Sequence, residues 1–338
     1  GALWCGTTIV SQAGSENWQR QMFHSDPVPE ARGTFFRVET DGSSTNYDMV
    51  WGYPQLHAFQ STVSPAIFRF YRGIGLIRSV ESTLPMEKEG ARAILSGRYY
   101  LENLAAKART NYTEEGGIEG YRLAQETAEY NIYENENYIP MGFTFDRYMT
   151  EKNYKSLPGE TADRLLVKDL VLSEENAARY GYLMEEDTDT EQDLMTMEEF
   201  EAHCDARSKS ACTRFSYDRD GYTAQADLPA KSLVFFSVPY DKGFSAYVDG
   251  VRTQIIEADF GLTAVLVPQG KHEIRLFYRP YGLAAGAAAS ALSAAALIAL
   301  FFAERRRRIL NKNSEKCYDN ALNAVADARA SMREEERL

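Results

Sequence analysis

Cysteine and histidine are scarce in this sequence, with four of each in 338 residues. So few cysteines exclude a disulfide-dense miniature scaffold, and their spacing contains no four-ligand zinc pattern. Positive charge is also in deficit, because 37 Lys and Arg residues against 49 Asp and Glu residues leave a formal net charge of −12. This balance argues against a protein that binds nucleic acid through its overall charge, so no nucleic-acid partner is expected.

The common catalytic signatures are missing as well. The sequence has no GxSxG, HExxH, P-loop or GxGxxG motif, so no catalytic residue, cofactor or metal ion is predicted. The chain begins with Gly1, and no basic segment followed by an apolar one stands at its start. We interpret it as a piece of a longer polypeptide or as a processed chain. Its composition, 44% hydrophobic and 25% charged, is typical of a folded protein with room for about two domains.

One long uncharged run stands out near the C-terminus. Residues 282–303 contain no charged side chain, and 22 helical residues would span roughly 33 Å, enough to cross a bilayer core of about 30 Å. Four arginines follow at 305–308, which marks the cytoplasmic end under the positive-inside rule. The alternative is an alanine-rich soluble helix, but only Ser290 and Ser293 would supply its polar face. The run therefore predicts a transmembrane helix, with the bulk of the chain outside the cytoplasm.

Small residues recur along this predicted helix. Gly282, Gly286, Ser290 and Ala294 follow one another at intervals of four, a pattern that lets a second helix approach closely. We therefore expect its partners to be membrane lipid and other transmembrane helices of a larger protein. The segment 304–338 is predicted to form a short, partly helical cytoplasmic tail, since both charge signs are mixed there.

The remaining sequence predicts an α+β fold. After a lead-in segment at 1–32, helical and strand-like patterns alternate through 33–212, which we expect to be a mixed α/β extracytoplasmic region. From 213 to 280 short apolar strands alternate with turns, among them Asp249-Gly250, so this part is predicted to be an antiparallel β-sandwich close to the membrane. The individual expectations are helices at 64–71, 89 onward, 150–155 and 161–171, and strands at 34–39, 130–133, 138–145 and 233–238.

Two polar clusters leave alternatives open. The acidic stretch 185–193 could bind calcium, but it lacks the central glycine and terminal glutamate of an EF-hand loop, which favours a solvated loop. His203, Cys204 and Cys212 could bind a metal ion, although a local disulfide or two independent free thiols are the favoured interpretations. Cys317 is expected to be a reduced cytoplasmic thiol.

A compact loop between two predicted strands supplies the candidate substrate-binding residues, Tyr240, Asp241 and Phe244. An aromatic face can stack on a sugar ring and a carboxylate can bind its hydroxyls, so a saccharide or a lipid headgroup is the ligand that this combination indicates. The simpler alternative, which the pattern favours, is a turn that holds the two strands in register.

Several of these motifs together resemble one known family. The run from Val234 to Gly250, the segment 267–272 and the stretch 277–282 before the membrane helix are similar to the C-terminal end of the YfhO family of bacterial membrane proteins. Upstream, 35–39, 46–53, 59–62 and 132–143 resemble its extracytoplasmic segment. The sequence departs from the family where Phe244 stands in place of the usual tryptophan.

The resemblance implies a large polytopic protein, similar to membrane-embedded glycosyltransferases that use lipid-linked sugars and decorate envelope polymers such as teichoic acids. Its acidic catalytic residue is expected in an early loop of the membrane domain, which no residue of this chain matches. One hypothesis is therefore an accessory ectodomain that positions the acceptor polymer, with an envelope glycan or lipid-linked sugar as its partner. The other is a non-catalytic, membrane-anchored envelope module that binds glycan or a partner protein.

Overall fold

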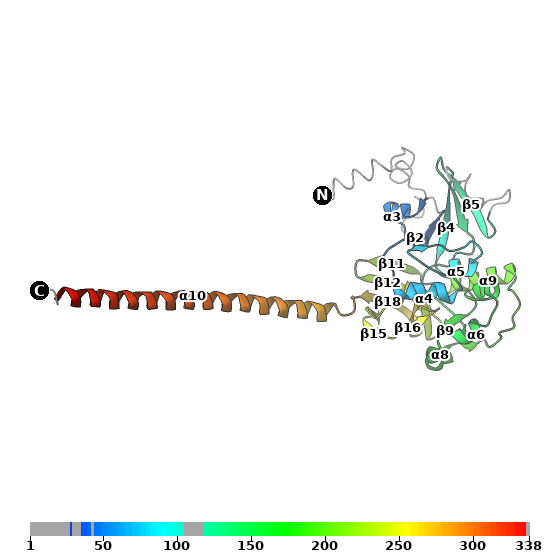
Figure 1. Cartoon of the computed structure of the whole chain (residues 1–338). Coiled ribbons are helices and arrows are strands. Elements are labelled where there is room, and N and C mark those ends of the chain that lie inside the picture. Colours follow the sequence, from blue (N-terminus) through cyan, green and yellow to red (C-terminus); the bar gives the residue numbers. More distant parts are fainter. Residues whose placement is uncertain (1–27, 29–34, 42–43, 105–117, 336–338) are drawn as a thin grey trace. The chain divides into compact units, whose positions relative to one another are not determined.

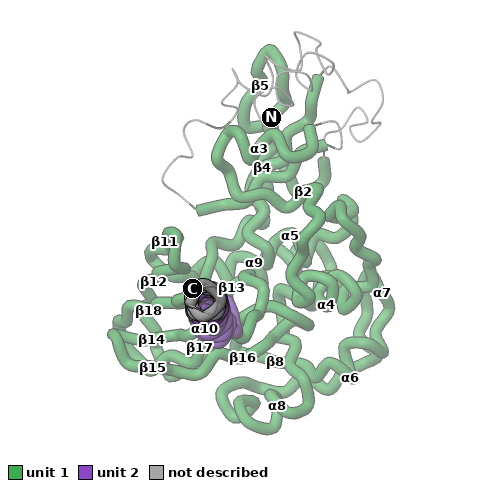
Figure 2. Tube along the Cα trace, turned by 60° about the vertical axis from the view of Figure 1, so that its left-hand side comes forward, with its two compact units in different colours: residues 1–279 green, residues 280–338 purple. Residues whose placement is uncertain are grey.

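The computed structural model describes residues 28, 35–41, 44–104 and 118–335. The lead-in segment 1–32 therefore lies outside the described residues except for Val28, as does Cys5. The chain divides into two compact units, residues 1–279 and 280–338 (Figure 2). The first unit combines helices with several sheets and the second contains one long apolar helix, so the fold is α+β with a single C-terminal helix of membrane-spanning type.

The first sheet forms one end of the first unit (Figures 1 and 2). Its strand order is β1-β4-β6-β5, with β1 parallel to β4 and the other pairs antiparallel. Buried side chains such as Val38, Leu101, Tyr130 and Ile132 form its core. The elements of this end are β1 (Arg37–Thr40), α3 (Tyr47–Trp51), β2 (Ala58–Phe59), β3 (Glu81–Ser82), β4 (Gly97–Asn103), β5 (Tyr121–Glu126) and β6 (Tyr130–Asn135).

Helices and a small parallel sheet surround the largest hydrophobic cluster, which includes Phe70, Ile94, Met149, Leu172 and Phe200. The sheet order is β10-β8-β9, with both pairs parallel. The elements of this part are α4 (Pro65–Gly73), α5 (Glu89–Ile94), β8 (Arg147–Thr150), α6 (Glu151–Tyr154), α7 (Gly159–Leu165), β9 (Leu170–Leu172), α8 (Glu174–Tyr180), η4 (Gly181–Leu183), β10 (Glu185–Glu186) and α9 (Met197–Lys209).

Two antiparallel sheets complete the unit, with strand orders β11-β12-β18-β14-β15 and β16-β17-β13-β7. Side chains from both sheets meet in one hydrophobic cluster that includes Ala246, Ile274, Val234 and Phe236. The two sheets therefore share one hydrophobic core. The strands are β7 (Phe143–Thr144), β11 (Arg214–Asp218), β12 (Gly221–Leu228), β13 (Ser232–Pro239), β14 (Phe244–Val248), β15 (Val251–Thr253), β16 (Ile255–Ala258), β17 (Leu262–Val267) and β18 (Gly270–Tyr278).

The second of these sheets is buried on both faces. Val234 and Phe236 of β13 belong to the cluster between the two antiparallel sheets, whereas Leu233 and Phe235 belong to the large helical cluster. A strand that is covered on both sides needs apolar residues at every position, which explains the continuous run at 233–236. The same sheet takes in β7 from residues before 213, so its pairing crosses the boundary that the sequence pattern suggested.

The hairpin turns follow local backbone chemistry. Asp249 and Gly250 have φ angles of 50° and 80°, the left-handed pair that the Asp-Gly sequence predicts between β14 and β15. Asp259 and Phe260 make a second left-handed pair, with φ angles of 43° and 63°, between β16 and β17. Asp259 holds this less favourable turn, because its Oδ1 accepts from the N–H of Val171 while its own N–H donates to the Val171 carbonyl, both at 2.8 Å.

The local expectations succeeded where capping or alternation was clear. The helix predicted at 64–71 is α4, whose N-cap Ser64 accepts from the N–H of Ala66 at 3.3 Å. The helix predicted at 161–171 is wrong in its second half, because α7 ends at Leu165 and residues 170–172 form strand β9 beside β8. An apolar Leu-Val-Leu run suits a buried strand as well as a helix, and only the tertiary pairing decides. Within 138–145, only Phe143–Thr144 is a strand.

The second unit consists mainly of α10 (Leu283–Glu335), 53 residues long. Its apolar part has a mean hydropathy of 2.0 and none of it is buried within the chain, so it qualifies by length and composition as a membrane span. The helix continues through the arginines and past residue 311, where only partial helix was expected. Pairs such as Glu304 and Arg308, 3.6 Å apart one turn along, contribute a little to this continuation.

Candidate functional site

An open pocket of about 340 Å³ lies beside the loop that the sequence singled out. Asp241 and Phe244 line it, together with residues of the β11–β12 hairpin and with Tyr278 at the end of β18. Tyr240 does not line it. The structure therefore brings two of the three sequence-predicted residues to one concave surface and separates the third from them.

The loop from Pro239 to Phe244 is shaped by its own side chains. Asp241 Oδ1 accepts from the N–H of Gly243 at 2.7 Å, which closes the turn. A Cβ atom at Gly243 would lie 2.3 Å from the carbonyl oxygen of Arg279, so only glycine allows the loop to approach the end of β18 this closely. Phe244 is then opposite Tyr278 in the β14–β18 register. Strands β13 and β14 belong to different sheets, so the loop crosses from one sheet to the other and does not hold the two strands in register. It also forms one wall of the pocket.

Aromatic rings form a continuous row along this wall. The ring centroids of Tyr222 and Phe244 are 6.0 Å apart, and those of Phe244 and Tyr278 are 4.9 Å apart. Phe215 stacks on Tyr222 at 5.7 Å and continues the row across the sheet. Strands β12 and β14 flank β18, so the three strands bring these rings together. Tyr217, a residue that is 55% exposed, also lines the pocket and offers a further solvent-accessible ring.

Carboxylates stand at the edge of the row. Asp218 accepts from both terminal nitrogens of Arg275, at 2.8 and 2.9 Å, and from two backbone N–H groups of its own turn. The hydrogen bonds from Arg275, followed by those of the turn, lower the pKa of Asp218 to about 2. The hydrogen-bonding capacity of Asp218 is therefore used by Arg275 of β18 and by the backbone of its own turn. Asp220 and Asp241 complete the acidic lining.

Tyr240 occupies a different environment. Its N–H donates to the carbonyl of Gly261 at 2.7 Å, which ties the loop to the β16–β17 turn. Burial, followed by the negative charge of Glu257, raises the pKa of its phenol. Tyr240 therefore anchors the loop to the β16–β17 turn through its backbone, away from the pocket lining.

The sequence did not reveal the other half of the pocket. Tyr222 and Tyr278 lie 56 positions apart, and Asp220 belongs to a hairpin that was recognised only as a turn. The one available signal was the alternation of strands β12, β14 and β18, which predicts an antiparallel sheet but not the order of its strands. The resulting surface of aromatic faces and carboxylates is suited to a ligand with many hydroxyl groups.

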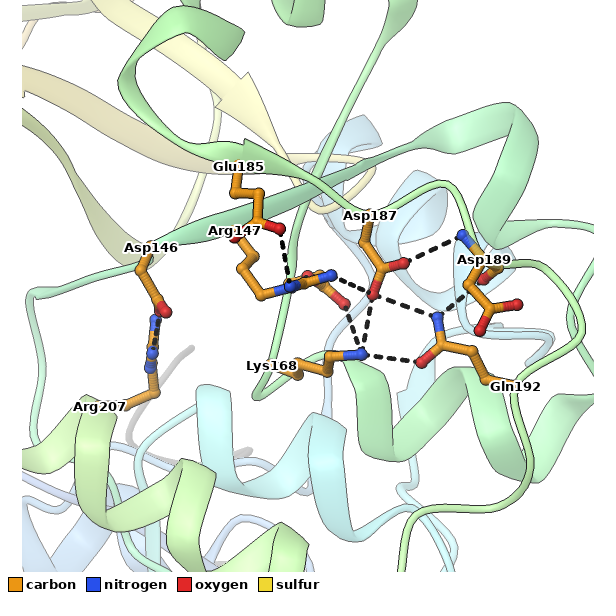
Figure 3. A network of polar contacts seen from close by, with 9 residues as sticks. Asp146, Arg147, Lys168, Glu185, Asp187, Asp189, Gln192 and Arg207 are labelled. Atoms are coloured by element: carbon orange, nitrogen blue, oxygen red, sulfur yellow. Dashed lines mark hydrogen bonds and ion pairs between the residues drawn. The ribbon is translucent and has the colours of Figure 1, made fainter.

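A second polar cluster accounts for the acidic stretch at 185–193 (Figure 3). Asp187 turns inward and is 3% exposed, whereas Glu185, Asp189 and Asp193 are exposed. Lys168 Nζ lies 2.8 Å from Asp187 Oδ2, and Arg147 Nη2 lies 3.0 Å from the same oxygen. The stretch is thus mostly solvated, as predicted, but one carboxylate anchors it.

The two buried carboxylates of this cluster have opposite protonation behaviour. Burial, followed by the negative charge of Asp187, raises the pKa of Asp169 to about 7. Burial also acts on Asp187, but hydrogen bonds from Lys168, the Asp189 N–H and Arg147 outweigh it and lower its pKa to about 2. Asp187 therefore holds a negative charge that the two cations share, and Glu185 lies 3.4 Å from Arg147 as a further carboxylate.

Metal binding finds no support in the cysteines or acidic residues. Within residues 28, 35–41, 44–104 and 118–335, no group of three His, Cys, Asp or Glu side chains could hold a metal ion. Cys204 and Cys212 are both free thiols. Cys204 packs in the large helical cluster and Cys212 against the cluster of the antiparallel sheets, so the second of the favoured interpretations, independent thiols, describes them. Burial raises the pKa of both.

Comparisons with known proteins agree with the chain's organisation. The family described as "Bacterial membrane protein YfhO" matches residues 9–218 and 194–290, well over half of the chain. The "Uncharacterized protein YfhO" of Bacillus subtilis (strain 168) is 24% identical over 139 residues, which cover 40% of this chain and 15% of that relative. No solved structure gives a significant match. By the extent of the family match, the chain belongs to the YfhO family of bacterial membrane proteins.

Proposed function

We propose that this chain is the C-terminal part of a polytopic glycosyltransferase that transfers lipid-linked sugar to a cell-envelope polymer, and that it positions the acceptor. The observation that carries the proposal is the pocket at Asp241 and Phe244, where three aromatic rings and carboxylates share one surface. Rings that face solvent next to hydrogen-bond acceptors are the usual means of holding a sugar or polyol.

The place of this pocket along the chain supports the proposal. Strand β18 ends at Tyr278, which lines the pocket, and α10 begins at Leu283. Four residues therefore lie between this pocket residue and the helix that could span a membrane. The five steps of extended chain from Tyr278 to Leu283 reach about 18 Å at most. An acceptor held there would be close to the bilayer surface, where a lipid-linked donor presents its sugar.

Catalysis is assigned to another part of the full-length protein. Transfer from a lipid-linked donor needs a carboxylate at the membrane and a cavity for the lipid. Residues 282–303 include no ionisable side chain, and one helix cannot enclose a lipid. The small-residue stripe of α10 fits packing against other membrane helices, which would supply both.

The proposal also fixes a topology. The first unit lies outside the cytoplasm and the arginines at 305–308 lie inside, because positive charge is retained on the cytoplasmic side. In intact cells expressing the full-length protein without native cysteines, a membrane-impermeant thiol reagent should label Ser245→Cys and not Lys312→Cys. Labelling of position 312 alone would reverse the orientation and remove the acceptor site from the envelope side.

Binding by the pocket can be measured directly. The 338-residue chain in a polyoxyethylene detergent is titrated by calorimetry with maltotriose and with an oligomer of glycerol phosphate. Phe244→Ala should weaken the binding of at least one ligand about tenfold, the equivalent of a lost aromatic contact. Asp241→Asn, which keeps the size of the side chain but removes its charge, should weaken binding a few-fold.

Tyr240→Phe is the matched control, because it changes an aromatic residue of the same loop that does not line the pocket. It should bind like the unchanged chain. Equal affinities for Phe244→Ala and Tyr240→Phe would remove the pocket from the account and leave the loop as a structural turn. If a protein ligand from the envelope bound and neither maltotriose nor the glycerol phosphate oligomer did, the module hypothesis would replace the acceptor hypothesis.

A further inference from the structure

A second cavity, of about 210 Å³, lies among β1, β2, α4 and the end of β13. Its volume is below the range of about 300–1,000 Å³ that is common for drug-sized ligands, so it suits a small chemical group. Two arginines, Arg37 and Arg78, line it, and no Asp or Glu does. This is unexpected in a chain with 12 more acidic than basic residues.

Arg37 comes from β1 and is held by neutral oxygen atoms. Its Nη1 donates to the Leu95 carbonyl at 2.5 Å and to Ser237 Oγ at 2.7 Å, and its Nη2 donates to the Ser237 carbonyl at 2.8 Å. Burial lowers the pKa of Arg37 to about 10, and only tyrosines act against this effect. These bonds fix the guanidinium plane, and no carboxylate of the residues that the structure describes forms an ion pair with it.

Arg78 lies in the segment before β3 and is 8% exposed. Its Nη1 donates to the carbonyl of Ser79, and its guanidinium lies 5.7 Å from the centre of the Phe68 ring. Its buried Nε has no hydrogen-bond partner. A buried donor without a hydrogen-bond partner is energetically unfavourable, so the guanidinium of Arg78 is incompletely satisfied by the chain itself.

The neighbouring Arg92 shows how the same fold neutralises an arginine for structural purposes. It is 2% exposed, and its Nε and Nη2 donate to the two carboxylate oxygens of Glu39 at 2.6 and 3.2 Å. Glu39 is two residues from Arg37 on the same strand. Among the residues described, the same strand therefore pairs one buried arginine with a carboxylate, whereas no carboxylate lines the cavity at Arg37 and Arg78.

We propose that the cavity at Arg37 and Arg78 is a binding site for a phosphate group, as a monoester or a diester. Guanidinium groups bind phosphate oxygens through paired N–H donors. Two guanidiniums offer more donors than the two oxygens of a carboxylate can use. A phosphate monoester has three terminal oxygens to share between them, and a diester has two terminal oxygens in a tetrahedral arrangement with two ester oxygens. The site is distinct from the pocket at Asp241 and does not depend on glycan binding there.

The test uses the 338-residue chain in a polyoxyethylene detergent. Such a detergent contains no phosphate group and therefore cannot compete for the site. Inorganic phosphate, glycerol 3-phosphate and phosphatidylglycerol in mixed micelles are titrated separately by calorimetry, with acetate at equal ionic strength as the reference anion. At least one phosphate compound should bind saturably and tighter than acetate. Binding of glycerol 3-phosphate identifies a soluble source, whereas saturable binding of phosphatidylglycerol alone identifies a lipid headgroup.

Variants decide whether this binding belongs to the cavity. Arg78→Gln should weaken it at least tenfold, and Arg78→Lys, which keeps the charge but loses the planar donor pair, should weaken it less. Arg122→Gln is the control, because Arg122 is an exposed arginine that pairs with Glu134 outside the cavity. The proposal fails if no phosphate compound binds better than acetate, or if Arg78→Gln and Arg122→Gln bind equally well.

Discussion

The cluster around Arg147 and the cavity at Arg37 and Arg78 each gather two cations in the interior of the first unit. Around Arg147 and Lys168 the chain supplies its own anion, Asp187, within 3.0 Å of both. Around Arg37 and Arg78 it supplies carbonyls, a hydroxyl and an aromatic ring, and no carboxylate of the described residues lines the cavity. The first arrangement is complete without a ligand and the second is not. Unneutralised charge, more than the number of charges, therefore distinguishes a candidate binding site from structural support.

Removing the internal anion should have the largest effect. Asp187→Asn leaves Arg147 and Lys168 without their shared charge, and breaking such a buried pair costs about 3 kcal/mol or more. Urea unfolding at pH 7, followed by circular dichroism, should show this loss in the free energy of unfolding. Asp189→Asn is the control, since Asp189 is exposed. Similar values for the two variants would mean that the cluster does not stabilise the fold.

The same variant has a defined pH dependence. The pKa of Asp187 is lowered to about 2 in the folded chain from an unfolded value near 3.9. Its contribution to stability is therefore fully present above about pH 4 and is lost as the pH falls through about 2. The difference between the unchanged chain and Asp187→Asn should shrink across that interval. A constant difference would show that the substitution acts through packing.

Removing a cation from the cavity should affect the free energy of unfolding in the opposite way. Without phosphate, Arg78→Gln removes a buried cation that has no carboxylate partner, so the free energy of unfolding should change little or rise. With saturating phosphate, only the unchanged chain should gain stability. The measurement is the same urea titration with and without glycerol 3-phosphate. If Arg78→Gln lowered the free energy of unfolding as much as Asp187→Asn does, Arg78 would be a structural residue and the two regions would not differ.

The sequence predicted much of the architecture because its signals are local. Alternation and the Asp249-Gly250 turn predicted the antiparallel strands, Ser64 predicted the start of α4, and the uncharged run predicted the apolar helix. The exchange of helix for strand at Leu170–Leu172 depends on pairing with β8, which no local pattern encodes.

The candidate sites were less accessible to sequence reasoning. Asp241 and Phe244 were found because they share a loop, but Tyr222 and Tyr278 reach the pocket only through the order β12-β18-β14. Arg37 and Arg78 are ordinary arginines in the sequence. Their distinctive property is that they line a cavity into which no Asp or Glu of the described residues reaches, which appears only once the chain is folded.

The claim that this chain positions an acceptor while chemistry occurs elsewhere is tested most directly by glycosyl transfer. The full-length protein and the 338-residue chain are compared with lipid-linked sugar as donor and an envelope polymer as acceptor. The account predicts turnover by the full-length protein only, with Phe244→Ala raising KM for the acceptor several-fold while kcat is unchanged. Robust turnover by the 338-residue chain, lost in Asp241→Asn, would contradict it and place the catalytic carboxylate in the pocket itself.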